Sequence, residues 1–79
     1  MKVEIYTKDN CVWCTRAKNL MSDLQISYLE HDLSDDDERK EFYKRIGEGV
    51  STVPQVYING NRIGGYKELS RWLESNGNK

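Results

Sequence analysis

Residues 3–14, VEIYTKDNCVWC, decide how this chain folds. The first four alternate at period two and include β-branched side chains, which predicts a strand, and the polar residues 7–10 end it. Cys11 and Cys14 follow where a helix begins. Residues i and i+3 of a helix share one face with Cβ atoms about 5–6 Å apart, and a disulfide joins Cα atoms roughly 4.4–6.8 Å apart. The two thiols therefore predict a redox site whose disulfide opens and closes without refolding.

The place of Cys11 in the predicted helix bears on its reactivity. In the first turn, unpaired N–H groups and the positive end of the helix dipole stabilise a thiolate, and Cys14 lies one turn deeper. Two other interpretations stay open but are less favoured. A zinc site needs four ligands, and the chain offers only these two cysteines and one histidine, His31. A structural disulfide needs an oxidising compartment, and so short a loop removes little unfolded-state entropy.

The composition predicts a soluble globular protein with a single domain spanning residues 1–79. Hydrophobic residues make up 37% and charged residues 32%, and the formal net charge is −1. This balance leaves no cationic surface for nucleic acid, and no stretch could span a bilayer. The N-terminus lacks the apolar segment of a signal peptide. Two cysteines without a secretion signal predict the reducing cytoplasm.

Apolar spacing predicts the elements that follow. The first helix turns Cys14, Ala17, Leu20, Met21 and Leu24 inward, and a second strand covers residues 27–32. Ser34 and Asp37 resemble a capping box at the start of a second helix. The acidic residues 35–38 at the start of this helix, and Lys44 and Arg45 near its end, match the helix dipole. Phe42 and Ile46 face inward, and Gly47 and Gly49 end the helix.

The last third of the chain predicts a hairpin and a closing helix. Residues 55–58 form a strand, Asn59-Gly60 is a strong turn signal, and residues 61–63 return. Gly64-Gly65 ends the sheet, residues 66–74 form a helix with Leu69, Trp72 and Leu73 inward, and residues 76–79 are a frayed tail. The order β-α-β-α-β-β-α predicts one α/β mixed sheet, its first pair parallel and its second antiparallel, with helices covering its faces.

Three motifs in this order resemble the glutaredoxin family over nearly the whole chain. They are CxxC after the first strand, Thr52-Val53-Pro54 before the third, and Gly64-Gly65 after the hairpin. The resemblance implies the thioredoxin-like fold, a four-stranded mixed sheet flanked by three helices. It also implies a disulfide oxidoreductase of electron transport and cell redox homeostasis, with glutathione as cosubstrate.

The resemblance assigns roles to individual residues. It makes Cys11 the nucleophile and Cys14 the resolving thiol. Lys8 would favour the thiolate or pair with a glutathione carboxylate, although an ordinary solvated lysine is the alternative. Trp13 would form an aromatic wall beside the thiol. The Val53–Pro54 bond is expected to be cis, which places Thr52, Val53 and Pro54 in the substrate site with the Val53 backbone free to pair with the cysteinyl part of glutathione.

The resemblance implies that the γ-glutamyl end of glutathione binds to the second glycine of Gly64-Gly65 and to the three residues that follow it. These are Gly65, Tyr66, Lys67 and Glu68. Many family members have aspartate at the last position, so the longer Glu68 departs from the pattern. In the alternative interpretation, the glycines end a strand and Glu68 stabilises a helix N-terminus.

Val12 and Trp13 replace the proline and tyrosine of the family's common CPYC. Val12 frees an N–H group and loosens the turn, which bears on the redox potential or opens room for a metal cluster. The resemblance therefore leaves a second function open, in which Cys11 and glutathione from each of two subunits bridge an iron–sulfur cluster. Recycling by a thioredoxin reductase is a third function, disfavoured by the retained Gly64-Gly65-Tyr66. We expect a monomer that becomes a dimer only when a cluster is bound. The expected clients are disulfide-containing or glutathionylated proteins. Ribonucleotide reductase is a frequent client of the family, but nothing in this sequence points to it specifically.

Overall fold

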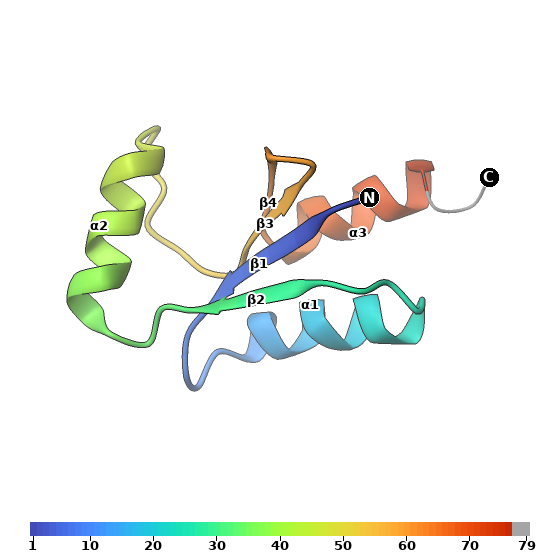
Figure 1. Ribbon diagram of the computed structural model, residues 1–79, viewed down its shortest axis with the longest axis horizontal. Helices are drawn as coiled ribbons and strands as arrows, with labels where there is room; N and C mark the ends of the chain where they lie inside the picture. Colours follow the sequence, from blue (N-terminus) through green and yellow to red (C-terminus); the bar gives the residue numbers. More distant parts are fainter. Residues whose placement is uncertain (77–79) are drawn as a thin grey trace.

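The computed structural model describes residues 1–76 and has the predicted element order (Figure 1). The chain alternates strands and helices until a β-hairpin, and a third helix closes it. The elements are β1 (Val3–Thr7), α1 (Val12–Asp23), β2 (Leu29–Asp32), α2 (Asp36–Ile46), β3 (Gln55–Ile58), β4 (Asn61–Gly64) and α3 (Tyr66–Asn76). No helix among these described residues is long and apolar enough to cross a membrane.

The four strands form one mixed sheet in the order β2-β1-β3-β4. β1 pairs with β2 in parallel, with Ile5 opposite Glu30, and α1 supplies the crossover that a parallel pair needs. β1 pairs with β3 antiparallel, with Ile5 opposite Val56, and β3 pairs antiparallel with β4. The predicted parallel and antiparallel pairs are both confirmed. The carboxyl end of central strand β1 thus leads straight to the cysteine loop.

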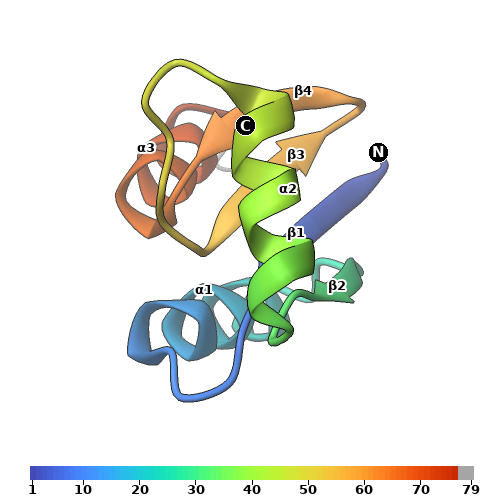
Figure 2. The ribbon, with the colours of Figure 1, turned by 90° about the vertical axis from the view of Figure 1, so that its left-hand side faces the viewer.

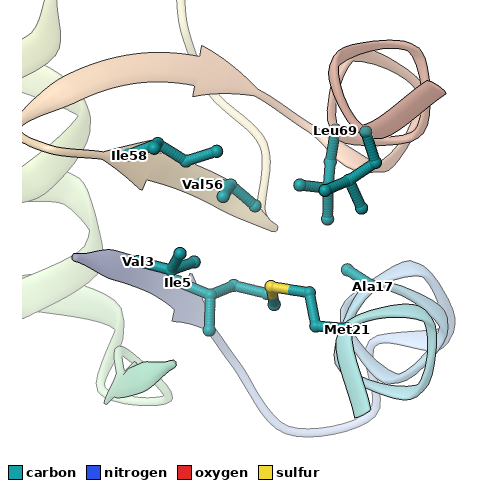
Figure 3. Close-up of a cluster of buried hydrophobic side chains, with 8 residues drawn as sticks. Val3, Ile5, Ala17, Met21, Val56, Ile58 and Leu69 are labelled. Carbon is teal, nitrogen blue, oxygen red and sulfur yellow. The ribbon is translucent and has the colours of Figure 1, made fainter. Parts of the chain in front are cut away.

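The core lies between one face of the sheet and the helices α1 and α3 (Figure 3). Alternation along β1 sends Val3, Ile5 and Thr7 to this face and leaves Glu4 and Tyr6 on the other. Side chains from β1, β3, α1 and α3 meet there. The core residues are Val3, Ile5, Ala17, Met21, Val56, Ile58, Leu69 and Leu73. This packing fixes α1, and with it the cysteine pair, against the sheet.

The opposite face of the sheet is covered only at one end. Helix α2 stands apart from α1 and α3, beside the end of β1 (Figures 1 and 2), and Phe42 is its single buried residue. The Phe42 ring stacks on Tyr6 with ring centroids 4.3 Å apart, and Tyr6 stacks on His31 at 4.5 Å. The expectation that helices bury both faces is therefore wrong for most of this side, because α2 has too few inward apolar residues.

The hairpin turn confirms the Asn-Gly prediction. Asn59 and Gly60 have φ angles of 53° and 83°, the left-handed conformation that a tight two-residue turn requires. The Asn59 N–H donates to the Lys2 carbonyl at 2.8 Å, and Asn59 Oδ1 accepts from the Lys2 N–H at 2.9 Å. The turn is therefore tied to the start of the chain beside it.

The predicted cap of α2 is wrong by one residue. Asp35 is the N-cap, and its carboxylate accepts from the Glu38 N–H at 2.9 Å. The Ser34 hydroxyl has other partners, since it donates to Asp32 Oδ1 and accepts from the Asp9 N–H. Residues 36–38 still place their acidic side chains in the first turn, and Gly47 (φ 69°) ends the helix as predicted.

Smaller differences concern the ends of elements. β2 begins at Leu29 and not at residue 27, and β4 includes Gly64. Leu24 caps the end of α1 and is 52% exposed, so it does not face inward as predicted. α3 extends to Asn76, where a frayed tail was predicted, and residues 77–79 of that tail lie outside the described residues.

Candidate active site

Cys11 is the N-cap of α1, the position that serine or threonine usually occupies. Its backbone is extended (φ −114°, ψ 102°), and its Sγ accepts a hydrogen bond from the Cys14 N–H at 3.1 Å. Cys11 and Cys14 form a disulfide with Cα atoms 5.2 Å apart. Cys11 is half-buried, whereas Cys14 is only 1% exposed. The predicted difference in access is confirmed, and an N–H group of the helix points at the more exposed sulfur.

The loop before Cys11 is anchored at two places. The Leu33 N–H donates to the Thr7 carbonyl at 2.7 Å, and the Asp9 N–H donates to Ser34 Oγ at 2.9 Å. Asn10 then adopts φ 53°, a left-handed conformation that asparagine tolerates better than most residues. These contacts fix the direction in which the chain enters α1, and so the position of the Cys11 sulfur.

The segment 52–54 runs past Cys11. The Val53–Pro54 bond is cis, as the resemblance implied. The Val53 carbonyl oxygen lies 3.7 Å from Cys11 Sγ. No acceptor among the described residues takes a hydrogen bond from the Val53 N–H. A backbone donor and acceptor thus stand beside the sulfur, where an extended peptide could pair with them.

At the start of α3, Gly64 and Glu68 are in close contact. Gly64 has φ 125°, and a Cβ placed on it would come within 2.9 Å of Glu68 Cγ. The Gly65 N–H donates to Glu68 Oε1 at 2.8 Å, so Glu68 caps the helix in the manner of the second residue of a capping box. The interpretation in which Glu68 stabilises the helix N-terminus is therefore confirmed, with one carboxylate oxygen occupied.

A groove of about 690 Å³ connects these parts of the molecule, and we call it the α3 groove. It brings together all the residues predicted to bind glutathione except Lys8. Trp13 is 52% exposed and forms one wall, with its ring centroid 5.4 Å from that of Tyr66. The lining residues are Trp13, Thr52, Val53, Pro54, Gly65, Tyr66, Lys67, Glu68, Ser70, Arg71 and Glu74.

Lys8 lies apart from the α3 groove. It lines a second, more polar hollow of about 550 Å³ that Cys11 and Cys14 also line. In that hollow the Thr7 hydroxyl donates to Glu30 Oε2 at 2.6 Å, and Lys18 Nζ donates to the same oxygen at 3.0 Å. The Thr7 hydrogen bond, helped by Lys18, holds the pKa of Glu30 below its usual range. Lys8 is therefore close to the cysteines but not to the other predicted binding residues.

The comparisons with known proteins agree with this geometry. The Glutaredoxin family model matches residues 3–63, most of the chain. The chain belongs to the glutaredoxin family. Glutaredoxin 3 of Escherichia coli is 43% identical over 68 residues, which cover 85% of this chain and 80% of that protein. A glutaredoxin relative from Synechocystis is 38% identical over 68 residues, or 86% of this chain and 62% of its own length.

Solved glutaredoxins have the same fold. Glutaredoxin 1 from Francisella tularensis, complexed with cacodylate, superposes with a TM-score of 0.90 at 33% identity and covers 99% of this chain and 98% of its own. A buckwheat glutaredoxin–glutathione complex superposes with a TM-score of 0.77 at 25% identity, over 95% of this chain and 69% of that one. The thioredoxin-like fold implied by the resemblance is confirmed.

This glutaredoxin is a disulfide oxidoreductase whose chemistry lies in the Cys11–Cys14 pair. One sulfur is accessible, its partner is buried one turn away, and a disulfide joins the two residues, whose Cα atoms are 5.2 Å apart. Such a pair accepts two electrons when the bond opens and returns them when it closes. Within residues 1–76, no three His, Cys, Asp or Glu side chains gather as a metal-binding group.

Sequence reasoning missed two features of this glutaredoxin site. Gln55 is buried, and its Nε2 donates to the Thr52 carbonyl at 3.0 Å, which braces segment 52–54. The sequence signal that could have predicted this contact is a polar residue directly after the proline, at the start of a buried strand. The second feature is the length of the α3 groove, which continues past Glu68 to Ser70, Arg71 and Glu74. These polar residues recur at helical spacing on the closing helix.

Proposed function

We propose that this glutaredoxin depends on glutathione and reduces both protein disulfides and glutathione mixed disulfides. Its clients are disulfide-containing or glutathionylated proteins of a reducing cytoplasm, where a single dithiol stays catalytic. The buckwheat glutaredoxin, which was solved as a complex with glutathione, supports the proposal by similarity. Glutathione is the cosubstrate of the reaction described below.

The observation that carries the proposal is the free backbone of Val53 beside Cys11. Its N–H has no partner among the described residues, and its carbonyl oxygen lies 3.7 Å from Cys11 Sγ. A peptide that pairs with both groups as an added strand would bring its own sulfur to Cys11. Fixing the two sulfurs together converts a bimolecular exchange into a local one, which is a large part of catalysis.

The rest of the α3 groove matches the ends of a tripeptide. The start of α3 presents N–H groups and the positive end of a helix dipole to a carboxylate, and Lys67 adds a positive charge. Trp13 and Tyr66 supply an apolar wall for the cysteinyl methylene group. Glu68 Oε1 already accepts from the Gly65 N–H, so its second oxygen is the more available acceptor for the ammonium of the γ-glutamyl group.

The reaction proceeds by two exchanges with a mixed glutathione disulfide. The Cys11 thiolate attacks the glutathione sulfur, the client thiolate leaves and takes a proton, and Cys11 becomes bonded to glutathione. The thiolate of a second glutathione then attacks that sulfur, releasing oxidised glutathione and the Cys11 thiolate. With a client disulfide, the Cys11 thiolate attacks one client sulfur and releases the other as a thiolate. The Cys14 thiolate then attacks the Cys11 sulfur and releases the second client thiolate. This route forms the Cys11–Cys14 disulfide, which two glutathione molecules reduce.

The test is a glutathione–disulfide exchange assay on wild type, Cys11→Ser and Cys14→Ser. The substrate is the mixed disulfide of glutathione and 2-mercaptoethanol. We expect Cys11→Ser to abolish turnover and Cys14→Ser to retain most of it, since Cys11 alone completes both exchanges. Equal loss in both variants would contradict this mechanism and require both thiols.

The same preparations test the iron–sulfur carrier function. A glutathione-dependent enzyme of the proposed kind is expected to purify as a colourless monomer. A brown dimer that loses its visible absorption on becoming monomeric would favour the carrier instead.

A further inference from the structure

The α3 groove is longer than a bound tripeptide requires. It follows α3 from Tyr66 to Glu74, eight residues later, or about 12 Å along the helix axis at 1.5 Å per residue. The residues assigned to glutathione use only the first turn, up to Glu68. The remaining six residues of helix, about 9 Å long, would accommodate about three residues of extended chain.

The α3 groove, taken together with Arg16 beside Trp13, has one more positive than negative charge. Arg71 lines it and is exposed, and Arg71 has no ion pair among the described residues. Arg16 also has no ion pair there; it does not line the groove but lies over the Trp13 ring, with its guanidinium carbon 4.7 Å from the ring centroid. Lys67 adds a third cation. Two carboxylates, Glu68 and Glu74, line the same groove, so the three cations exceed the anions by one.

This positive charge is local. The chain as a whole has a net charge of −1, and the first turn of α2 is acidic at residues 36–38. A positive surface at one end of a slightly acidic protein favours and orients approaching anionic segments. Trp13, which is half exposed beside Tyr66, offers the same segment an apolar contact.

We propose that the second and third turns of α3, with Arg71 and Arg16, bind the polypeptide part of the client and select clients with acidic residues beside the target cysteine. The inference rests on the proposed function, because glutathione must occupy the first turn of α3. The client chain would cross Trp13 from its cysteine and run along α3. Its Asp or Glu side chains would pair with the two guanidinium groups, which are suited to carboxylates.

The test compares three glutathionylated peptides that are identical except at two residues beside the cysteine, which are Asp, Ser or Lys. A fourth substrate is the glutathione mixed disulfide of 2-mercaptoethanol, which has no polypeptide. We expect kcat/KM to fall at least threefold from the acidic to the neutral peptide and again to the basic one at about 50 mM salt. Since exposed charge pairs are screened, we expect this preference to shrink at about 500 mM salt.

Two charge-reversal variants locate the effect. Arg71→Glu is expected to abolish or invert the order of the three peptides while changing turnover of the small substrate less than twofold. Lys40→Glu makes the same change of charge at an exposed position of α2 outside the α3 groove, and it is expected to keep the order.

Equal rates for the three peptides, or the same response to both variants, would overturn the inference. If the small substrate is still turned over normally, the proposed function is unaffected by that result. Failure to turn over the small substrate would overturn the proposed function and this inference together.

Discussion

Glu68 Oε1 accepts a hydrogen bond from the backbone N–H of Gly65 at 2.8 Å, so one carboxylate both caps α3 and forms part of the α3 groove. The contact depends on Gly64, whose missing Cβ leaves room for the Glu68 side chain. The glycine pair is therefore more than a strand end, because it allows a glutamate to fold back over the start of the helix. The shape of the groove at this point depends on these two residues.

Removing the Glu68 cap should reduce stability. Glu68→Ala leaves the Gly65 N–H without its acceptor and removes a negative charge from the helix N-terminus, which should lower the free energy of unfolding by about 1 kcal/mol. Glu68→Gln keeps an acceptor oxygen and should lose about half as much. Urea unfolding of the three proteins measures this. A Glu68→Ala variant as stable as wild type would contradict the cap.

A methyl group at Gly64 should cost more than one at Gly60. Both residues have positive φ, 125° and 83°, but a Cβ at Gly60 meets nothing within 4 Å. Gly60→Ala should therefore show only the backbone cost, about 1–2 kcal/mol. Gly64→Ala adds a clash with Glu68 and should lose about 3 kcal/mol. Thermal or urea unfolding compares them directly, and equal losses would mean that the Gly64–Glu68 contact does not constrain the fold.

Stability should fall on acidification, partly because of Glu30. The Thr7 hydroxyl and Lys18 hold the pKa of Glu30 below its usual range, and a hydrogen bond with His31 does the same to the pKa of Glu4. A carboxyl with a lowered pKa in the folded state stabilises above its unfolded pKa, and this contribution is lost as pH falls below about 4.3 through the folded value.

The variant Glu30→Gln isolates one of these groups. It keeps an oxygen that can accept from Thr7 but no longer titrates, so its urea midpoint should fall less than that of wild type between pH 6 and pH 3. Glu41→Gln, at an exposed position with no ion pair among the described residues, serves as the control. If Glu30→Gln and Glu41→Gln lost stability in parallel with wild type, Glu30 would have no part in the acid response.

Trp13 should contribute to substrate binding more than to stability, because its side chain is half exposed beside Tyr66. Trp13→Ala should lower kcat/KM for a glutathione mixed disulfide by about threefold to tenfold, equivalent to about 1 kcal/mol of lost aromatic contact. Trp13→Phe keeps an aromatic face and should remain within about twofold of wild type. Steady-state kinetics on both variants decides this, and a fully active Trp13→Ala would remove the tryptophan from the site.

Local patterns in the sequence predicted the elements because those patterns are themselves physical constraints. Alternation along β1, the spacing of Ala17 and Met21 on α1, and the Asn59-Gly60 turn each allow essentially one local structure. The position of the disulfide follows from two cysteines separated by one helical turn. The helical crossover and the tight turn predict the parallel first pair and the antiparallel hairpin, but the pairing of β1 with β3 across the long segment that contains α2 was not predicted.

Features that depend on tertiary partners could not be found this way. Ser34 and Asp35 are both good caps, and only the competing contacts of Ser34 with Asp32 and Asp9 exclude it. Lys8 was expected to favour the Cys11 thiolate or to pair with a glutathione carboxylate, and both roles stay predictions. Its position three residues before Cys11 did not predict that it lines the hollow of the two cysteines and not the α3 groove. The hydrogen bond from the Gln55 side chain to the Thr52 carbonyl likewise cannot be predicted from the spacing of apolar residues in the sequence.

Once the disulfide is reduced, we expect the helix N-terminus to keep the Cys11 sulfur ionised, because the Cys14 N–H points at it and the α1 dipole favours negative charge there. The most direct test is the rate of alkylation of reduced Cys14→Ser protein by iodoacetamide as a function of pH, which reports the Cys11 thiolate alone. We expect a midpoint clearly below the value of about 8.5 for a free cysteine. A midpoint at or above about 8.5 would contradict it.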